Sequence, residues 1–246
     1  MPYDALEQEK QWRRKPAGKK PRGLPERHHF PHNRVRAKLS EALIELGCNA
    51  ASSVLEIGCG SGEDVEFIRR ASGNITGVDI SPEAVEAFGK KGFQGFLADA
   101  GKLPFAENTF DYVIYPATLH HLAGQGNLTD YLKEAARVVR KKGYVIALEP
   151  NLLHISGLLM NVFNTIKPGI TGLVPHERAL SPFHLMGAFR AAGLESERCR
   201  AASYTWNRLP LGVSRFIAGH EDGVRGKTPF NLFGWFSIVW GKKGSV

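Results

Sequence analysis

VLEIGCGSGED, residues 54–64, is the stretch that decides the fold. An apolar run ends in the glycine-rich segment 58–62, and a helical pattern follows directly. Glycines let the chain turn tightly and let a ligand approach the backbone, while the first turn of a helix presents free N–H groups. The next apolar run ends at Asp79, 21 residues beyond Gly58. A carboxylate there can accept hydrogen bonds from both hydroxyls of a ribose, so the two segments predict a nucleoside site.

Strand-like and helix-like segments alternate from residue 53 onward. The apolar runs SVLEIG, NITGVD, FQGFLA, FDYVIY and GYVIALE alternate with the helical patterns GEDVEFIRRA, SPEAVEAFGKK and LTDYLKEAARVVRK. Short apolar strands separated by helices are typical of a parallel sheet covered on both faces. The pattern therefore predicts an α/β domain with a Rossmann-like, doubly wound sheet.

The two ends of the chain differ from this regular centre. Residues 1–32 are polar and rich in proline, and we predict a flexible basic arm there. A helical pattern then opens a single domain over residues 33–246. After Glu149 the regularity loosens, and insertions at about 150–180 and 207–234 are predicted to form a helical cap over the strand ends.

The positive charge of the chain is concentrated in the arm. The 246 residues carry a formal net charge of +8. Residues 1–40 hold eleven Lys and Arg against four acids, and the remaining 21 basic and 20 acidic residues nearly cancel. A basic arm can be an ordinary solvated tail, or it can contact RNA, anionic lipid or an anionic substrate.

Cysteine content and hydropathy restrict the cellular setting. Cys48, Cys59 and Cys199 are widely spaced and odd in number, which favours neither a disulfide framework nor a zinc site. No run approaches the ~20 apolar residues of a membrane span, and the first residues lack a secretory signal pattern. We expect a cytoplasmic protein, with peripheral contact to a membrane as an alternative.

The glycine-rich loop resembles motif I of class I S-adenosylmethionine-dependent methyltransferases. A dinucleotide fingerprint would need a third glycine at position 63, where this chain has Glu63. The resemblance continues through LADAGKLPF, NTFDYVIYPATLHHL and RVVRKKGYVIALEPN, in the family's order and spacing, from about residue 40 to 150. Within the family the chain is most similar to the small-molecule, UbiE-like type 11 group.

The resemblance implies a fold, a cofactor and a set of contacts. The fold is a seven-stranded sheet, parallel except for an antiparallel last strand, and the cofactor is S-adenosyl-L-methionine. The implied contacts are Glu56, Gly58 and Gly60 on the methionyl and ribose side, Asp79 at the ribose hydroxyls, Ile80 on adenine, Asp99 and Ala100 at the adenine amino edge, and the backbone of Tyr115 beside the methionine moiety. Cys59 lies in the same loop, where we expect a small tolerated side chain rather than a nucleophile.

Two adjacent histidines, His120 and His121, follow the fourth predicted strand in YPATLHHLAG. An imidazole there can take a proton from a hydroxyl acceptor, shape the substrate wall, or simply pack. Because neighbouring side chains diverge by about 100° on a helix, we expect at most one ring to face the reacting methyl group, and we favour His121. No carboxylate or cysteine accompanies the pair at helical spacing, so no metal site is predicted.

The substrate is open between three hypotheses. The region after residue 150 is rich in large apolar side chains, which favours a small, hydrophobic or lipid-like acceptor, with O-methylation preferred. The basic arm keeps an RNA-modifying enzyme as an alternative, although YPAT lacks the Asn/Asp-Pro-Pro-aromatic arrangement of amino-directed adenine methylases. The third hypothesis is a non-catalytic partner that has kept cofactor binding.

Overall fold

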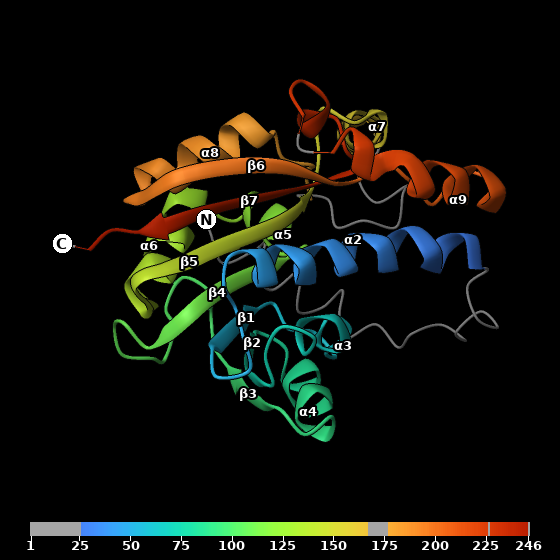
Figure 1. Cartoon of the computed structure of the whole chain (residues 1–246). Helices are drawn as coiled ribbons and strands as arrows, with labels where there is room; N and C mark the ends of the chain where they lie inside the picture. The colour runs from blue at the N-terminus through green and yellow to red at the C-terminus, as the bar shows by residue number, and fades with distance from the viewer. Residues whose placement is uncertain (1–25, 167–176, 226, 246) are drawn as a thin grey trace.

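A seven-stranded sheet forms the centre of the part of the chain that the computed structural model describes, residues 26–166, 177–225 and 227–245 (Figure 1). Its strands are β1 (Ser53–Ile57), β2 (Asn74–Asp79), β3 (Gln94–Leu97), β4 (Phe110–Pro116), β5 (Val139–Pro150), β6 (Leu194–Ser203) and β7 (Phe236–Lys243). The spatial order is β3-β2-β1-β4-β5-β7-β6. Strands β1 to β5 pair in parallel, and β7 runs antiparallel to both β5 and β6. The predicted sheet is confirmed.

The strand order reverses between β1 and β4, which are neighbours although two strands separate them in sequence. In open α/β sheets, a crevice forms at such a switch point, outside the carboxyl ends of the strands. The glycine-rich loop after β1 and the two histidines after β4 therefore meet at one edge of the sheet.

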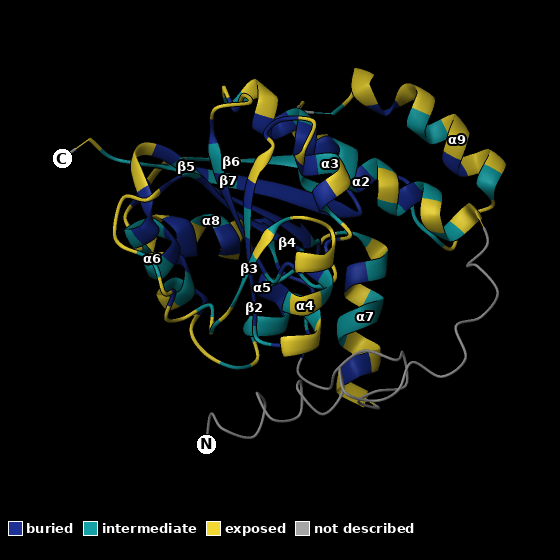
Figure 2. Cartoon of the chain, turned by 90° about the horizontal axis from the view of Figure 1, so that it is seen from below, coloured by how far each residue is buried: buried dark blue, intermediate teal, exposed yellow. Residues whose placement is uncertain are grey.

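Helices cover both faces of the sheet (Figures 1 and 2). They are α2 (Glu26–Glu45), α3 (Val65–Ile68), α4 (Pro82–Lys90), α5 (Leu119–Leu122), α6 (Leu128–Val138), α7 (Ile155–Ile166), α8 (Pro182–Ala191) and α9 (Leu211–His220), with the 3₁₀ turns η1 (Glu221–Gly223) and η2 (Phe230–Leu232). One hydrophobic cluster joins the sheet to α2, α3 and α4, and a second joins it to α5, α6 and α8. In Figure 2 the buried colour accordingly concentrates in the sheet, while the outer faces of the helices are exposed.

The helix before β1 begins earlier than the sequence predicted. Residues 26–32 were assigned to the flexible arm, but they form the first turns of α2. Pro31 lies inside this helix and is buried, where it extends the apolar stripe of Val35, Leu39 and Leu43 by one further turn. Near a helix start a proline removes only one backbone hydrogen bond, which the packing of this stripe offsets. The rest of the predicted arm lies outside the described residues.

Helices α7 and α9 lie at the end of the sheet where the parallel strands terminate (Figure 1). The first predicted insertion contains α7, and its residues 167–176 are outside the described part of the chain. The second contains α9, η1 and η2. No helix in the described ranges is both long and apolar enough to cross a membrane.

Ion pairs fasten α2 to the second insertion. Arg34 lies 2.6 Å from a carboxylate oxygen of Glu221, and Lys38 lies 3.0 Å from Asp222. Glu221 is buried and also accepts hydrogen bonds from the Ser203 hydroxyl and the Tyr204 amide. Because this carboxylate is fully paired, the network holds α2 in place beside the carboxyl edge of the sheet.

Candidate cofactor cleft and acceptor cavity

The loop after β1 needs glycine to adopt its shape. Gly58, Gly60 and Gly62 have φ angles of 75°, 50° and 73°, in the left-handed region that other residues rarely adopt. A Cβ atom on Gly58 would lie 2.5 Å from Oγ1 of Thr118, which itself donates to the carbonyl of Ile57 at 2.9 Å. The loop after β1 and the residues after β4 therefore touch without space for a side chain between them.

Asp79 organises the opposite side of this loop. Its two carboxylate oxygens accept the backbone N–H groups of Gly60 and Ser81, each at 2.9 Å. An ionised carboxylate offers about four acceptor positions, and these two backbone contacts occupy one position on each oxygen. The sequence prediction that this acid binds two hydroxyl groups is compatible with that geometry.

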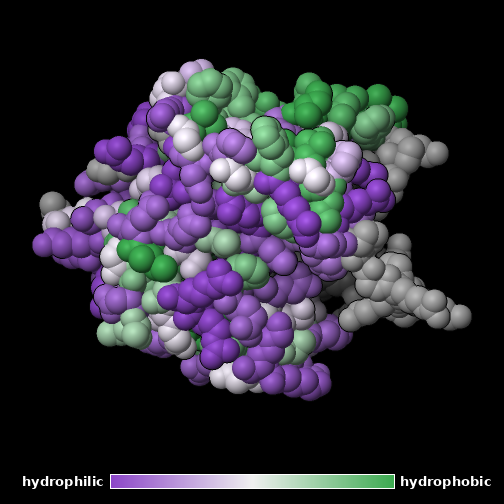
Figure 3. Space-filling model, turned by 45° about the vertical axis from the view of Figure 1, so that its right-hand side comes forward, coloured by the Kyte–Doolittle hydropathy of each residue, from purple (hydrophilic) through white to green (hydrophobic). Residues whose placement is uncertain are grey.

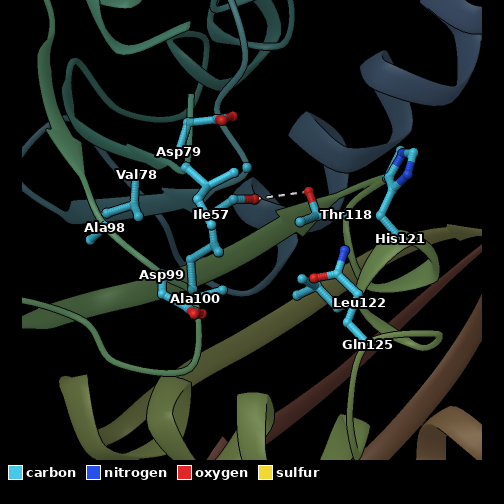
Figure 4. A pocket seen from close by; sticks show the side chains of 13 residues that line it. Ile57, Val78, Asp79, Ala98, Asp99, Ala100, Thr118, His121, Leu122 and Gln125 are labelled. Carbon is cyan, nitrogen blue, oxygen red and sulfur yellow. Dashed lines mark hydrogen bonds between the residues drawn. The ribbon is translucent and has the colours of Figure 1, made fainter. Parts of the chain in front are cut away.

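A narrow cleft runs between the ends of β1, β2 and β3 on one side and the segment after β4 on the other (Figure 4). Figure 4 shows Asp79, Asp99 and Ala100 on one side of this cleft, and Thr118, His121 and Gln125 on the other. The predicted cofactor residues that line the narrow cleft are Gly58, Asp79, Ile80, Asp99 and Ala100.

Three predicted residues point elsewhere. Cys59 is buried in the cluster that joins the sheet to α2, α3 and α4, so only its backbone can face a ligand. Tyr115 is fully buried and donates its hydroxyl hydrogen bond to the carbonyl of Tyr131. Glu56 is also fully buried. For Tyr115 the expected contact is made by the backbone, and Cys59 was expected to carry a small side chain that does not react, so the burial of these two side chains is compatible with both expectations.

The wall at the end of β4 comes from residues that the sequence analysis did not select. The strand continues to Pro116, and Ala117 then turns the chain with a φ of 54°. Ala117, Thr118, Leu122 and Gln125 line the narrow cleft beside His121. The strand predicted from the sequence ends at Tyr115, one residue before the end of β4 in the structure.

Glu56 is a fully buried acid on β1, two residues before the glycine-rich loop. Neither of its carboxylate oxygens has a hydrogen-bond partner among the described residues. Burial, together with repulsion from Asp64, raises the pKa of Glu56 well above its usual range. A buried carboxyl of this kind accommodates a ligand group that donates hydrogen bonds or carries positive charge.

A second, larger cavity of about 690 Å³ adjoins the narrow cleft, and the two share Ala117 and His121. One part of its wall is apolar and aromatic, and consists of Val35, Leu148, Leu159, Met160, Phe163, Trp206, Trp235 and Phe236. Charged side chains also reach it, among them Arg36, which pairs with Asp64 at 2.9 Å. Cavities of this size and lining hold small, largely apolar molecules.

Glu149 ties the histidine segment to the sheet. One of its oxygens accepts the N–H groups of Thr118 and Leu119, at 2.9 and 2.7 Å, and the other accepts the N–H of His120 at 3.2 Å. These are N–H groups at the start of α5, which have no partner within the helix. The fully buried Glu149 carboxylate thus fixes the direction in which α5 leaves β4.

His120 is held between two carboxylates. Its Nδ1 atom lies 2.7 Å from Glu149, its Nε2 atom lies 3.1 Å from Glu177, and all three side chains are buried. Burial opposes a charged imidazole, but the hydrogen bonds and charges of the two carboxylates outweigh burial and raise the pKa of His120 to about 9. At neutral pH both ring nitrogens then donate, which leaves His120 unsuited to act as a general base.

His121 is the histidine that faces both spaces. Its side chain is 20% exposed and lines the narrow cleft as well as the large cavity. The two imidazole rings nevertheless lie close together, with centroids 4.1 Å apart, and both reach the large cavity. Only His121 of the pair also lines the narrow cleft, so the expectation that at most one ring faces the reacting methyl group stays a prediction.

Glu177 adds a carboxylate to the histidine pair. Its oxygen lies 3.8 Å from Nε2 of His121, and the candidate ligand atoms of His120, His121 and Glu177 all lie within 4.8 Å of one another. The sequence argument against a metal site rested on the lack of a carboxylate at helical spacing. The structure supplies one from 57 residues beyond His120, across the connection to α8.

Residues 55–147, the segment that contains the loop, the cleft and the histidines, match a family model described as a methyltransferase domain. Residues 55–147 form a class I S-adenosylmethionine-dependent methyltransferase domain. Its cofactor is S-adenosylmethionine. This confirms the family and the cofactor expected from the glycine-rich loop.

Relatives of this methyltransferase domain have different substrates. A demethylmenaquinone methyltransferase of Tropheryma whipplei is 31% identical over 108 residues, which cover 42% of this chain and 44% of that one. The ubiquinone/menaquinone biosynthesis C-methyltransferase UbiE of Desulfotalea psychrophila is 30% identical over 113 residues, 44% and 45% of the two chains. A tRNA (carboxymethyluridine(34)-5-O)-methyltransferase of Arabidopsis thaliana is 36% identical over 70 residues, 28% and 17%. The chain spans less than half the length of each of these relatives.

Solved structures share the fold of the methyltransferase domain over most of the chain. A methyltransferase of Thermotoga maritima, described as a possible histamine N-methyltransferase, superposes with a TM-score of 0.66 at 21% identity, covering 89% of this chain and 93% of that one. A methyltransferase of Haloferax volcanii in complex with the activator Trm112 has a TM-score of 0.60 at 17% identity, with 89% and 95% covered. These similarities establish the fold.

The described residues fit the cofactor. The Asp79 carboxylate lines the narrow cleft as a hydrogen-bond acceptor, and the buried Glu56 has no hydrogen-bond partner in the described part of the chain. S-adenosylmethionine carries ribose hydroxyls and an α-ammonium group, which match these two carboxyl groups in kind. The methyltransferase domain therefore has a chemical partner for each polar end of its cofactor.

Proposed function

We propose that the chain transfers the methyl group of S-adenosylmethionine to a small, hydrophobic acceptor, with oxygen as the favoured acceptor atom. The observation that carries this proposal is the aromatic-walled cavity of about 690 Å³, which meets the narrow cleft at Ala117 and His121. An acceptor in that cavity would reach the cofactor at the junction of the two spaces. Holding the reactants at near-attack distance supplies much of the rate enhancement of such a transfer.

Residues of the narrow cleft would hold the cofactor. In this proposal Asp79 accepts the ribose hydroxyls, Ile80 packs on adenine, Asp99 accepts from the adenine amino group and Glu56 pairs with the α-ammonium group. When bound, the cofactor supplies an electrophilic methyl group on its sulfonium. The backbone of Ala117, rather than that of Tyr115, would border the methionine part, because Ala117 lines both spaces.

His121 would take the proton that a hydroxyl acceptor loses. It is the only member of the histidine pair that lines both spaces, and His120 is already engaged by two carboxylates. General base catalysis of this kind contributes about 10²–10⁴-fold to a rate. His120 would hold α5 in position rather than react.

The surface around the cavity supports an apolar acceptor. Exposed apolar side chains gather at the upper edge of the face in Figure 3, where α7 and α9 lie. They include Ile155, Leu158, Val162, Phe163 and Ile166 on α7 and Val213 and Phe216 on α9. Such a surface favours peripheral contact with lipid, from which a lipid-like acceptor could enter.

RNA modification is the second candidate, and the resemblance to a tRNA methyltransferase of Arabidopsis thaliana favours it. The basic segment that would contact RNA falls mostly outside the described residues. A purified full-length chain with methyl-labelled cofactor, offered hydroxylated aromatic compounds, extracted lipids or tRNA, separates the candidates. Label in small-molecule or lipid products supports the proposal, and mass spectrometry identifies the acceptor atom. Label only in tRNA supports the alternative, and cofactor binding without transfer to any of them supports a non-catalytic partner.

A further inference from the structure

We propose that His120, His121 and Glu177 form a binding site for one divalent transition-metal ion of the Zn²⁺ type. Two imidazoles and one carboxylate form a ligand set that such ions favour in proteins. The three candidate ligand atoms lie within 4.8 Å of one another, at the wall of the acceptor cavity. This inference goes beyond the proposed methyl transfer and does not depend on it.

The distances are close to those of a metal-bound set. With bonds of about 2.0–2.2 Å, tetrahedral ligands lie about 3.4 Å from one another. Glu177 lies 3.1 Å from Nε2 of His120 and 3.8 Å from Nε2 of His121. His121 is 20% exposed and borders the cavity, so its ring has space to turn toward an ion shared with His120 and Glu177.

Glu149 provides the outer contact that a metal-bound histidine needs. Histidine ligands usually donate their second ring N–H to a carboxylate or a carbonyl group, which fixes the tautomer and the direction of the ring. Here Nδ1 of His120 donates to Glu149 at 2.7 Å, and Nε2 points at Glu177. Glu149 is itself fixed by three backbone N–H groups, so the ligand nitrogen of His120 is oriented in advance.

The charge of the site also suits a divalent cation. Glu149 and Glu177 bring two carboxylates into one buried region. Buried charges are stable only when they are compensated by partners of opposite sign. A divalent ion on His120, His121 and Glu177 would take the place of the proton that Nε2 of His120 otherwise holds against Glu177, and a position open to the cavity would remain for a water molecule or an acceptor oxygen.

The test is metal binding by the full-length chain after treatment with a chelator. We expect calorimetry to show one Zn²⁺ per chain, and Co²⁺ to give the visible absorption of a low-symmetry site with nitrogen ligands. Glu177→Gln and His121→Ala should each weaken Zn²⁺ binding at least tenfold. His220→Ala, which removes an exposed imidazole on α9, is the matched control and should bind Zn²⁺ like the wild type.

Two outcomes overturn the inference. One is no stoichiometric uptake of Zn²⁺ by the wild-type chain. The other is uptake that Glu177→Gln and His121→Ala leave unchanged while circular dichroism shows both variants folded, because the ion then binds elsewhere. Methyl transfer is measured on the same samples. A chain that transfers methyl groups but binds no metal would contradict the metal site and leave the proposed function intact.

Discussion

Replacing Asp79 tests the cofactor cleft at its most constrained residue. Its carboxylate accepts N–H groups from Gly60 and Ser81 and would accept two ribose hydroxyls in the complex. A hydrogen bond to a charged group contributes about 1.5–3 kcal/mol, so losing both ribose contacts in Asp79→Ala should cost about 3–6 kcal/mol of binding free energy. This corresponds to a dissociation constant raised on the order of 10²–10⁴-fold. Asp79→Asn keeps one acceptor oxygen and should fall between Asp79→Ala and the wild type.

The assay is calorimetric titration with S-adenosylhomocysteine, paired with thermal unfolding of each variant. Asp79→Ala also leaves two backbone N–H groups without their acceptor, at about 1–3 kcal/mol for each group that stays buried, so its melting temperature should fall. Titrations are therefore run well below that temperature. Asp130→Asn, an exposed acid on α6, is the control and should bind normally. A folded Asp79→Ala chain that binds within about twofold of wild type would refute the assignment of the ribose site, because a twofold change is only about 0.4 kcal/mol.

Three further predictions test other parts of the site. His121→Ala should lower turnover by ~10²-fold or more and leave the dissociation constant of the cofactor near normal. Turnover equal to that of the wild type would show that His121 has only a packing role. Burial, reinforced by Arg36, lowers the pKa of His32 to about 4. Between pH 6.5 and pH 4, His32 binds a proton in the unfolded chain but not in the folded chain. The free energy of unfolding should therefore fall by up to about 3 kcal/mol as the pH falls from 6.5 to 4. His32→Gln should remove this pH dependence from the unfolding free energy. Gly58→Ala should destabilise the fold by about 1–2 kcal/mol or more from its φ alone, measured by urea unfolding, whereas Gly89→Ala in α4, where an added Cβ meets no atom within 4 Å, should be neutral or stabilising.

The sheet could be predicted because its signals are local. Each of the strands β1 to β5 contains an apolar run of a few residues. The ligand loop is recognisable by its glycines, which have positive φ angles in the structure. The start of α2 could not be predicted, because a proline such as Pro31 ordinarily interrupts a helix and the residues around it are polar. Only tertiary packing shows that Pro31 extends the buried stripe of the helix.

Site residues could be predicted where they lie at the end of a strand. They could not be predicted where a segment distant in sequence folds back to contact the site. Asp79 and Asp99 fall in the narrow cleft because each follows a parallel strand. Glu177 lies 57 residues from His120 and carries no motif, so sequence spacing gives no reason to pair them. Successive side chains on a strand point to opposite faces, so the environment of Tyr115 depends on its exact position in β4. Its side chain is buried in the core, whereas Ala117 lines the narrow cleft.

The large cavity is closed by segments from opposite ends of the described chain. The ring of His32 lies 4.8 Å from that of Trp235, and Arg34 pairs with Glu221. On the ribosome, the first of these segments emerges long before the second is synthesised. A nascent chain can therefore assemble the strands around the glycine-rich loop while one cavity wall is still missing. The cavity that would receive the proposed acceptor is therefore complete only when Trp235 and Phe236 have joined its wall.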